Sequence, residues 1–133
     1  MSEVIPSTHL DLLATTALAH VATIGPKGEP QSSPVWFGWD GTYVRIVQQV
    51  GLQQKVRNLQ REPRVALSIV DPANAYRCLE IRGTVERIEP DVDREFINSM
   101  AKKYLDEDRY SSGKPEDEFL VIVIRPERTT QMG

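Results

Sequence analysis

The order of hydrophobic and polar positions along the chain predicts a protein built mainly from strands. Short apolar or β-branched runs, each of ordinary strand length, occur at 18–24, 31–39, 42–50, 64–70, 78–86 and 119–125. The clearest alternation is in the fifth run, where Leu79, Ile81, Gly83 and Val85 fall on one face and polar residues fall on the other. The pattern therefore predicts six strands.

Two turn signals join neighbouring strands. The segment Gly25-Pro26-Lys27-Gly28 is rich in turn-forming residues and should reverse the chain. Asp40-Gly41 separates two strand-like runs, and Asp-Gly favours a tight hairpin because both turn positions adopt positive φ. Both signals predict antiparallel pairs.

Helical spacing appears before the first strand and in two of the connections between strands. Ser7 or Thr8 can cap a short helix over 9–15. Asp91 can cap a longer helix with an apolar stripe of Val92, Phe96, Met100 and Tyr104. Between these two, residues 52–61 predict a helix with Leu52, Val56 and Leu59 on one stripe, ended by Pro63.

These elements predict one antiparallel sheet that closes into a barrel, with helices in the connections. A dinucleotide-binding α/β fold is disfavoured, because strands and helices do not alternate and no G-x-G-x-x-G occurs. The 133 residues fit a single domain over 1–133.

Composition narrows the function. The net charge of −3 argues against general nucleic-acid binding. No apolar run approaches the ~20 residues of a membrane span, and the first residues lack a signal-peptide pattern. With Cys78 as the single cysteine, no internal disulfide or cysteine metal cluster is expected. We therefore expect a cytoplasmic protein without a metal.

Lys55 is the best candidate for binding chemistry. It lies with Asn58 on one flank of the stripe of the 52–61 helix, while Arg57 and Arg61 point largely away. Near a helix start, a lysine can reach an anion that the free N–H groups also attract. The alternative is a surface lysine whose ammonium stays in water.

Gln48 and Gln49 end the strand before that helix, and one of them should face inward. An inward amide can bond a heterocycle or satisfy backbone groups. The strand at 31–39 is unusual because Pro34 removes a ladder donor, which places it at an edge or bulge. Its aromatic residues can stack on a ligand, fill the core or cover a dimer interface: Trp36, Phe37 and Trp39.

The usual catalytic constellations are missing. His9 and His20 lack the spacing of a metal motif, and Cys78 has no histidine near it in the sequence. Any chemistry is therefore expected to come mainly from a bound cofactor.

Four segments together resemble the pyridoxamine 5′-phosphate oxidase-like family, on the branch that uses the deazaflavin coenzyme F420. They are LAHVATIGPKGEPQSSPVWF at 18–37, KVRNLQREPRVAL at 55–67, YRCLEIRGTVERI at 76–88 and IRPER at 124–128. The resemblance spans nearly the whole chain in order. It implies a mainly β, six-stranded antiparallel split β-barrel with flanking helices, which forms a homodimer with a cofactor in each of two grooves between subunits.

The resemblance also implies roles by position. Lys55 corresponds to the lysine that meets the cofactor phosphate, and Asn58 to the asparagine of the same K-x-x-N-L motif. Tyr76 corresponds to an aromatic residue that reaches the groove from the other subunit. The strand along the deazaflavin ring and the strand end near the phosphate-bearing tail correspond to Ser33, Pro34 and Val35, and to Gln48 and Gln49.

The implied activity is that of an F420H2-dependent reductase, which transfers a hydride to an unsaturated, conjugated or quinone-like small molecule. No strong general acid is visible, so the proton is expected from solvent. The alternatives are an FMN-binding oxidoreductase on the same fold and a non-catalytic protein that binds a cofactor.

Overall fold

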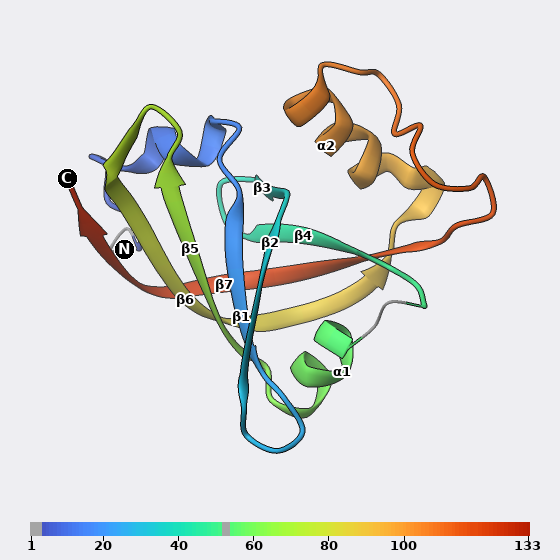
Figure 1. The fold of residues 1–133 in the computed structure, drawn as a ribbon, viewed down its shortest axis with the longest axis horizontal. Helices are drawn as coiled ribbons and strands as arrows, with labels where there is room; N and C mark the ends of the chain where they lie inside the picture. Colours follow the sequence, from blue (N-terminus) through green and yellow to red (C-terminus); the bar gives the residue numbers. More distant parts are fainter. Residues whose placement is uncertain (1–3, 52–53) are drawn as a thin grey trace.

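The computed structural model describes residues 4–51 and 54–133, which form one curled antiparallel sheet with helices at its ends (Figure 1). The strands are β1 (Ala19–Ile24), β2 (Pro30–Val35), β3 (Phe37–Trp39), β4 (Val44–Gln49), β5 (Arg64–Asp71), β6 (Asn74–Pro90) and β7 (Phe119–Met132). Their order in the sheet is β2-β1-β5-β6-β7-β4-β3. The predicted split-barrel class is confirmed.

The sheet has seven strands where six were predicted, because the run at 31–39 divides at Trp36. The Trp36 ring stacks on Tyr104 at 5.2 Å and 5°, and the Phe37 N–H donates to the Tyr104 hydroxyl at 3.1 Å instead of to a neighbouring strand. The two halves of the run, β2 and β3, lie at opposite edges of the sheet. Trp36 therefore connects the two edge strands. Because β2 and β3 do not pair with each other, the sheet curls without closing into a complete barrel.

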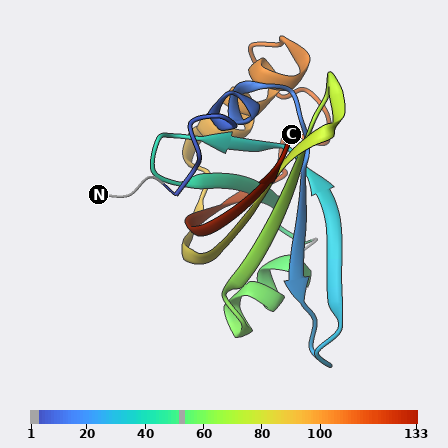
Figure 2. The same cartoon turned by 90° about the vertical axis from the view of Figure 1, so that its left-hand side faces the viewer.

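The core lies on the concave side of the sheet. Alternate residues of each strand point to opposite faces, so a single face collects the apolar side chains. Val21, Ile46, Leu67 and Ile81 are at most 1% exposed there, and Phe37 is fully buried among them. Figure 2 shows how the long strands β6 and β7 wrap around this interior.

Both predicted hairpins are present, and one differs in detail. Gly25–Gly28 turns the chain between β1 and β2, with Gly28 at φ +82°. At the second hairpin only Gly41 has positive φ, and Asp40 acts through its side chain instead. Its carboxylate accepts the N–H groups of Thr42 at 2.8 Å and Tyr43 at 2.7 Å.

The two α-helices follow the predicted pattern in part. α1 (Gln54–Arg61) buries Val56 and Leu59, while Leu52 and the predicted start of this helix lie outside the described residues. α2 (Glu95–Leu105) receives its cap from Asp91, whose carboxylate accepts the N–H groups of Phe96 and Ile97 at 2.8 and 2.9 Å.

Val92 was wrongly assigned to the buried stripe of α2. It belongs to a separate 3-10 turn, η2 (Val92–Arg94), and is 69% exposed. The turn bends the chain, with positive φ at Asp93 and Arg94, before α2 begins. As a result Ile97 and Ala101 are buried on α2.

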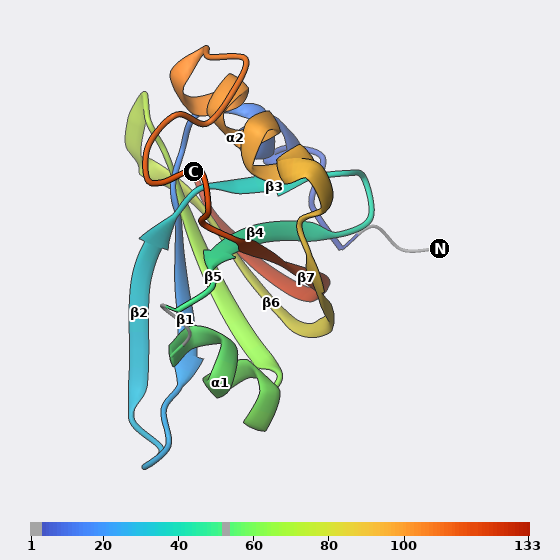
Figure 3. The ribbon, with the colours of Figure 1, turned by 90° about the vertical axis from the view of Figure 1, so that its right-hand side faces the viewer.

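The predicted first helix is a 3-10 helix, η1 (Leu10–Ala14), and neither Ser7 nor Thr8 caps it. The Thr8 hydroxyl is hydrogen bonded to the ring of His9 instead, at 2.8 Å. Within the described chain, no helix combines the length and apolarity that a bilayer crossing requires. Figure 3 shows α1 and α2 at opposite ends of the sheet, so the molecule has two distinct ends.

Candidate functional site

A polar pocket of about 530 Å³ lies between α1, the paired strands β1 and β2, and the end of β4. Its lining residues are Val21, Thr23, Gln31, Ser32, Ser33, Gln48, Gly51, Gln54, Lys55 and Arg57. This lining contains two cations and no carboxylate. The pocket is therefore suited to an anionic or hydrogen-bonding ligand.

Among the lining residues, Lys55 gives the strongest indication of an anionic ligand. Its side chain is half-buried, and burial lowers the pKa of its ammonium from the ordinary value for lysine. No hydrogen bond or ion pair joins the ammonium to another described residue, and burial is the only cause of the shift. An anion in the pocket would provide both the missing acceptor and the missing countercharge.

Asn58 lies behind the pocket wall. It is fully buried, and its Nδ2 donates to the Thr23 hydroxyl at 2.9 Å and to Gln31 Oε1 at 2.7 Å. Its Oδ1 accepts from Gln54 Nε2 at 2.8 Å. Since all three partners line the pocket, Asn58 holds the wall in place.

The contact with Arg61 determines which way the side-chain amide of Asn58 is oriented. A guanidinium can only donate, and Arg61 Nη2 lies 3.4 Å from Asn58 Oδ1. The amide oxygen of Asn58 therefore faces Arg61, and its NH₂ group faces Gln31. Gln31 in turn presents its oxygen to Asn58.

The structure brings three of the predicted site residues together: Ser33, Gln48 and Lys55 line the same pocket. Val35 is on the same strand as Ser33 but packs against the hydrophobic core. Pro34 lies between them on the edge strand β2 and is exposed, in agreement with its missing N–H.

The remaining predicted residues lie outside the pocket lining. Gln49 is half-buried, and its carbonyl accepts from the Gln48 side chain at 3.4 Å. Asn58 contacts the lining residues from behind. Tyr76, 81% exposed near the start of β6, lies at the far end of the sheet from α1. Its contact with a second subunit stays a prediction.

Sequence reasoning missed Thr23, Gln31 and Gln54, and placed Arg57 away from the site although it lines the pocket. Thr23 carried a usable signal. It occupies a buried position in the alternation of β1, where an apolar residue would be expected. Nothing in the sequence pattern marked Gln31 and Gln54, because the orientation of their side chains depends on hydrogen bonds to Asn58.

The three candidate aromatics are placed within the chain. Phe37 is core, Trp39 packs against the core, and Trp36 stacks on Tyr104 with Tyr110 against its edge at 6.1 Å. Their apolar surface is thus largely covered without a second subunit, and they no longer argue for dimerisation. Among residues 4–51 and 54–133, no three His, Cys, Asp or Glu side chains lie close enough together to hold a metal ion.

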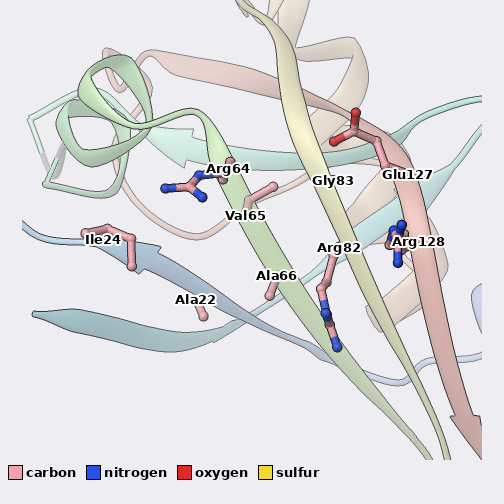
Figure 4. A pocket seen from close by; sticks show the side chains of 9 residues that line it. All are labelled: Ala22, Ile24, Arg64, Val65, Ala66, Arg82, Gly83, Glu127 and Arg128. Atoms are coloured by element: carbon pink, nitrogen blue, oxygen red, sulfur yellow. The ribbon is translucent and has the colours of Figure 1, made fainter. Parts of the chain in front are cut away.

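A second hollow, of about 570 Å³, lies on the opposite face of the sheet (Figure 4). The cross-strand partners Ala22 and Ala66 form its floor, and three arginines surround them, Arg64, Arg82 and Arg128. Because strand neighbours alternate in direction, Ala22 faces this hollow while Val21 and Thr23 face the Lys55 pocket. The hollow is mostly apolar and has no inward polar network like that of Asn58.

Comparisons with known proteins agree with this fold. Residues 5–133 match the sequence family described as Pyridoxamine 5′-phosphate oxidase. A solved structure called an F420 reductase is 37% identical and superposes with a TM-score of 0.84, covering 95% of this chain and 98% of that one. No curated protein is similar enough to count as a relative.

Two more distant structures share the fold alone. A conserved hypothetical protein from Mycobacterium tuberculosis is 20% identical with a TM-score of 0.74, covering 97% of this chain and 85% of that one. HupZ from Group A Streptococcus is 23% identical with a TM-score of 0.65, covering 96% and 93%.

Proposed function

The chain belongs to the pyridoxamine 5′-phosphate oxidase family, and we propose that it is an F420-dependent reductase. Its reaction would pass a hydride to an unsaturated, conjugated or quinone-like small molecule. The observation that carries the proposal is the 37% identity to an F420 reductase across 95% of this chain.

The pocket fits the phosphate-bearing part of such a cofactor. Lys55 is a half-buried cation without an acceptor among the described residues, and Arg57 adds a second positive charge. Lys55 would hold the phosphate, with Gln48 beside the tail. The planar ring would lie along β2 at Ser33, Pro34 and Val35, where the free edge of the sheet leaves backbone groups available.

When bound, F420 would supply the hydride. The residues of the chain would bind, orient and exclude water. No carboxylate is among the described lining residues of the pocket, and in this proposal the proton comes from solvent.

The proposal includes a homodimer. The Ala22–Ala66 hollow is a mostly apolar surface on the outer face, and a second copy is its proposed occupant. Ala66→Arg adds a fourth cation beside Arg64, Arg82 and Arg128 and should prevent pairing. Light scattering at micromolar concentration should show a dimer for the wild type and a monomer for the variant; a monomeric wild type would contradict the dimer.

The activity is tested with F420H2 and a panel of enones and quinones. Oxidation of F420H2 that requires both protein and acceptor supports the reductase. If the protein binds F420 and no acceptor is reduced, it is a cofactor-binding protein. If it turns over only with FMN, it is a flavin oxidoreductase of the same fold.

A further inference from the structure

The end of the molecule opposite the Lys55 pocket holds a separate apolar cavity. It measures about 410 Å³ and lies between η1, β3 and α2. Its lining residues are Leu10, Leu13, Ala14, Gly38, Trp39, Met100 and Lys103. Lys103 is the single charged member of this wall.

Gly38, in the cavity wall, packs closely against α2. A Cβ there would lie 3.1 Å from the Met100 methyl and 3.2 Å from the Phe96 ring. Leu10 stands at the rim and is 45% exposed. The cavity is thus bounded by close packing at Gly38 and by the exposed, apolar Leu10.

Lys103 is held firmly but lacks a countercharge. Its Nζ donates to the carbonyls of Phe37 at 2.8 Å and Leu13 at 3.2 Å. It also lies 4.0 Å from the centre of the Phe37 ring and 4.9 Å from that of Tyr104. Two carbonyls and two rings are neutral partners, and no carboxylate among the described residues pairs with it. Burial lowers the pKa of this ammonium to about 8, so it remains mostly charged at neutral pH.

The nearby charged groups are already engaged. Asp11 on η1 pairs with Arg77 at 2.6 Å, and Lys102 on α2 pairs with Asp106 at 2.9 Å. Asp40, next to β3, pairs with Arg45 at 2.9 Å. None of them neutralises Lys103. Its ammonium has three N–H groups, and the carbonyls take two.

We infer that the cavity between η1, β3 and α2 binds a small carboxylate with a compact apolar body, whose anionic end pairs with Lys103. The apolar walls would cover the body, and the third N–H of Lys103 would donate to the carboxylate. A charge-assisted bond of this kind gains strength where the surroundings are apolar. The site is separate from the Lys55 pocket and does not depend on the proposed reductase activity.

The test compares 1-naphthoate with its neutral analogue 1-naphthalenemethanol. Calorimetry gives the affinities, and methyl NMR of methionine gives the place, since Met100 is one of only three methionines and lines the cavity. We expect saturable binding of the acid at least tenfold tighter than that of the alcohol. The Met100 methyl signal should shift on titration. Equal affinities, or an unmoved Met100 signal, would overturn the inference.

Three variants sharpen the result. Lys103→Gln keeps a donor for the carbonyls but removes the charge, and should weaken naphthoate binding about tenfold while leaving the alcohol unchanged. Lys102→Gln, on the same helix and exposed, should change neither. Loss of naphthoate binding in Lys55→Gln, with Lys103→Gln unaffected, would place the ligand in the other pocket and sink the idea. Should Lys103→Gln fail to fold, the preference of the wild type for acid over alcohol still decides.

Discussion

Lys55 and Lys103 stand at opposite ends of the same sheet, and both are lysines whose pKa is lowered by burial. Their surroundings differ in kind. Lys103 donates to two backbone carbonyls and lies over aromatic rings, so its hydrogen bonds are largely satisfied while its charge is not. Lys55 has neither an acceptor nor a countercharge among the described residues, and its neighbours are polar side chains.

The difference shows why burial alone does not identify a binding lysine. Both ammonium groups carry the same kind of pKa shift, and only the acceptors around them tell the two apart. Lys55 is free to be neutralised by a ligand phosphate. Lys103 first joins η1 and β3 to α2, and any ligand role adds to that structural one.

The largest expected effect is a loss of stability when the hydrogen bonds of Asn58 behind the Lys55 pocket are removed. Asn58→Ala removes the hydrogen bonds of a buried amide and leaves Thr23, Gln31 and Gln54 without their shared partner. We expect a loss of about 3 kcal/mol in the free energy of unfolding, measured by urea denaturation. Asn74→Ala is the control, since its side chain is exposed and accepts one N–H. A loss no larger than that of the control would show that the network is not important for stability.

A tenfold effect is expected at Lys55 itself. Lys55→Ala should weaken F420 binding at least tenfold, about 1.4 kcal/mol, with little change in stability. Fluorescence titration measures the affinity. The control is Lys114→Ala in an exposed loop, which should bind normally. Unchanged affinity in Lys55→Ala would remove Lys55 from the site.

At the end of the sheet that carries the apolar cavity, Lys103 should make the stability of the protein depend on pH. The folded pKa of Lys103, about 8, lies below the ordinary 10.5. Between these values the unfolded chain binds more protons, so this group makes stability rise with pH. After allowance for partial exposure, we expect a gain of about 1 kcal/mol from pH ~7.5 to ~9.5. Lys103→Gln should lack this gain; an identical pH profile would contradict the assignment.

The smallest effect is expected at an exposed lysine. Lys102 forms an i,i+4 ion pair with Asp106 at 2.9 Å, and both side chains are largely exposed. Lys102→Gln should change the free energy of unfolding by less than about 0.5 kcal/mol. Thermal denaturation against wild type measures it. A larger loss would mean that neither burial nor acceptors distinguish the lysines of this chain.

Sequence patterns predicted most of the fold because strand alternation and turn formation depend on residues that are close together in the sequence. Alternation in 78–86 identified β6, and Asp40-Gly41 identified the β3–β4 hairpin. The division of 31–39 at Trp36 was not predictable from such patterns. It depends on Tyr104, which is distant in sequence and takes over the N–H of Phe37.

The lining of the candidate site was predictable where a residue acts by its own chemistry. Lys55 was found from its charge and helix position, Gln48 from its place at a strand end and Ser33 from the family resemblance, and the three line one pocket. Gln31 and Gln54 escaped notice because an amide joins a site only through its partner, here Asn58. The exposed place of Tyr76 likewise has a meaning only if a second subunit exists.

The central claim is that the Lys55 pocket binds the deazaflavin coenzyme. Titration of the purified wild-type protein with F420 and, in parallel, with FMN tests it most directly, with fluorescence as the readout. The account predicts saturable F420 binding that is at least tenfold tighter than FMN binding and is weakened by Lys55→Ala. Micromolar FMN binding without any F420 binding would contradict it.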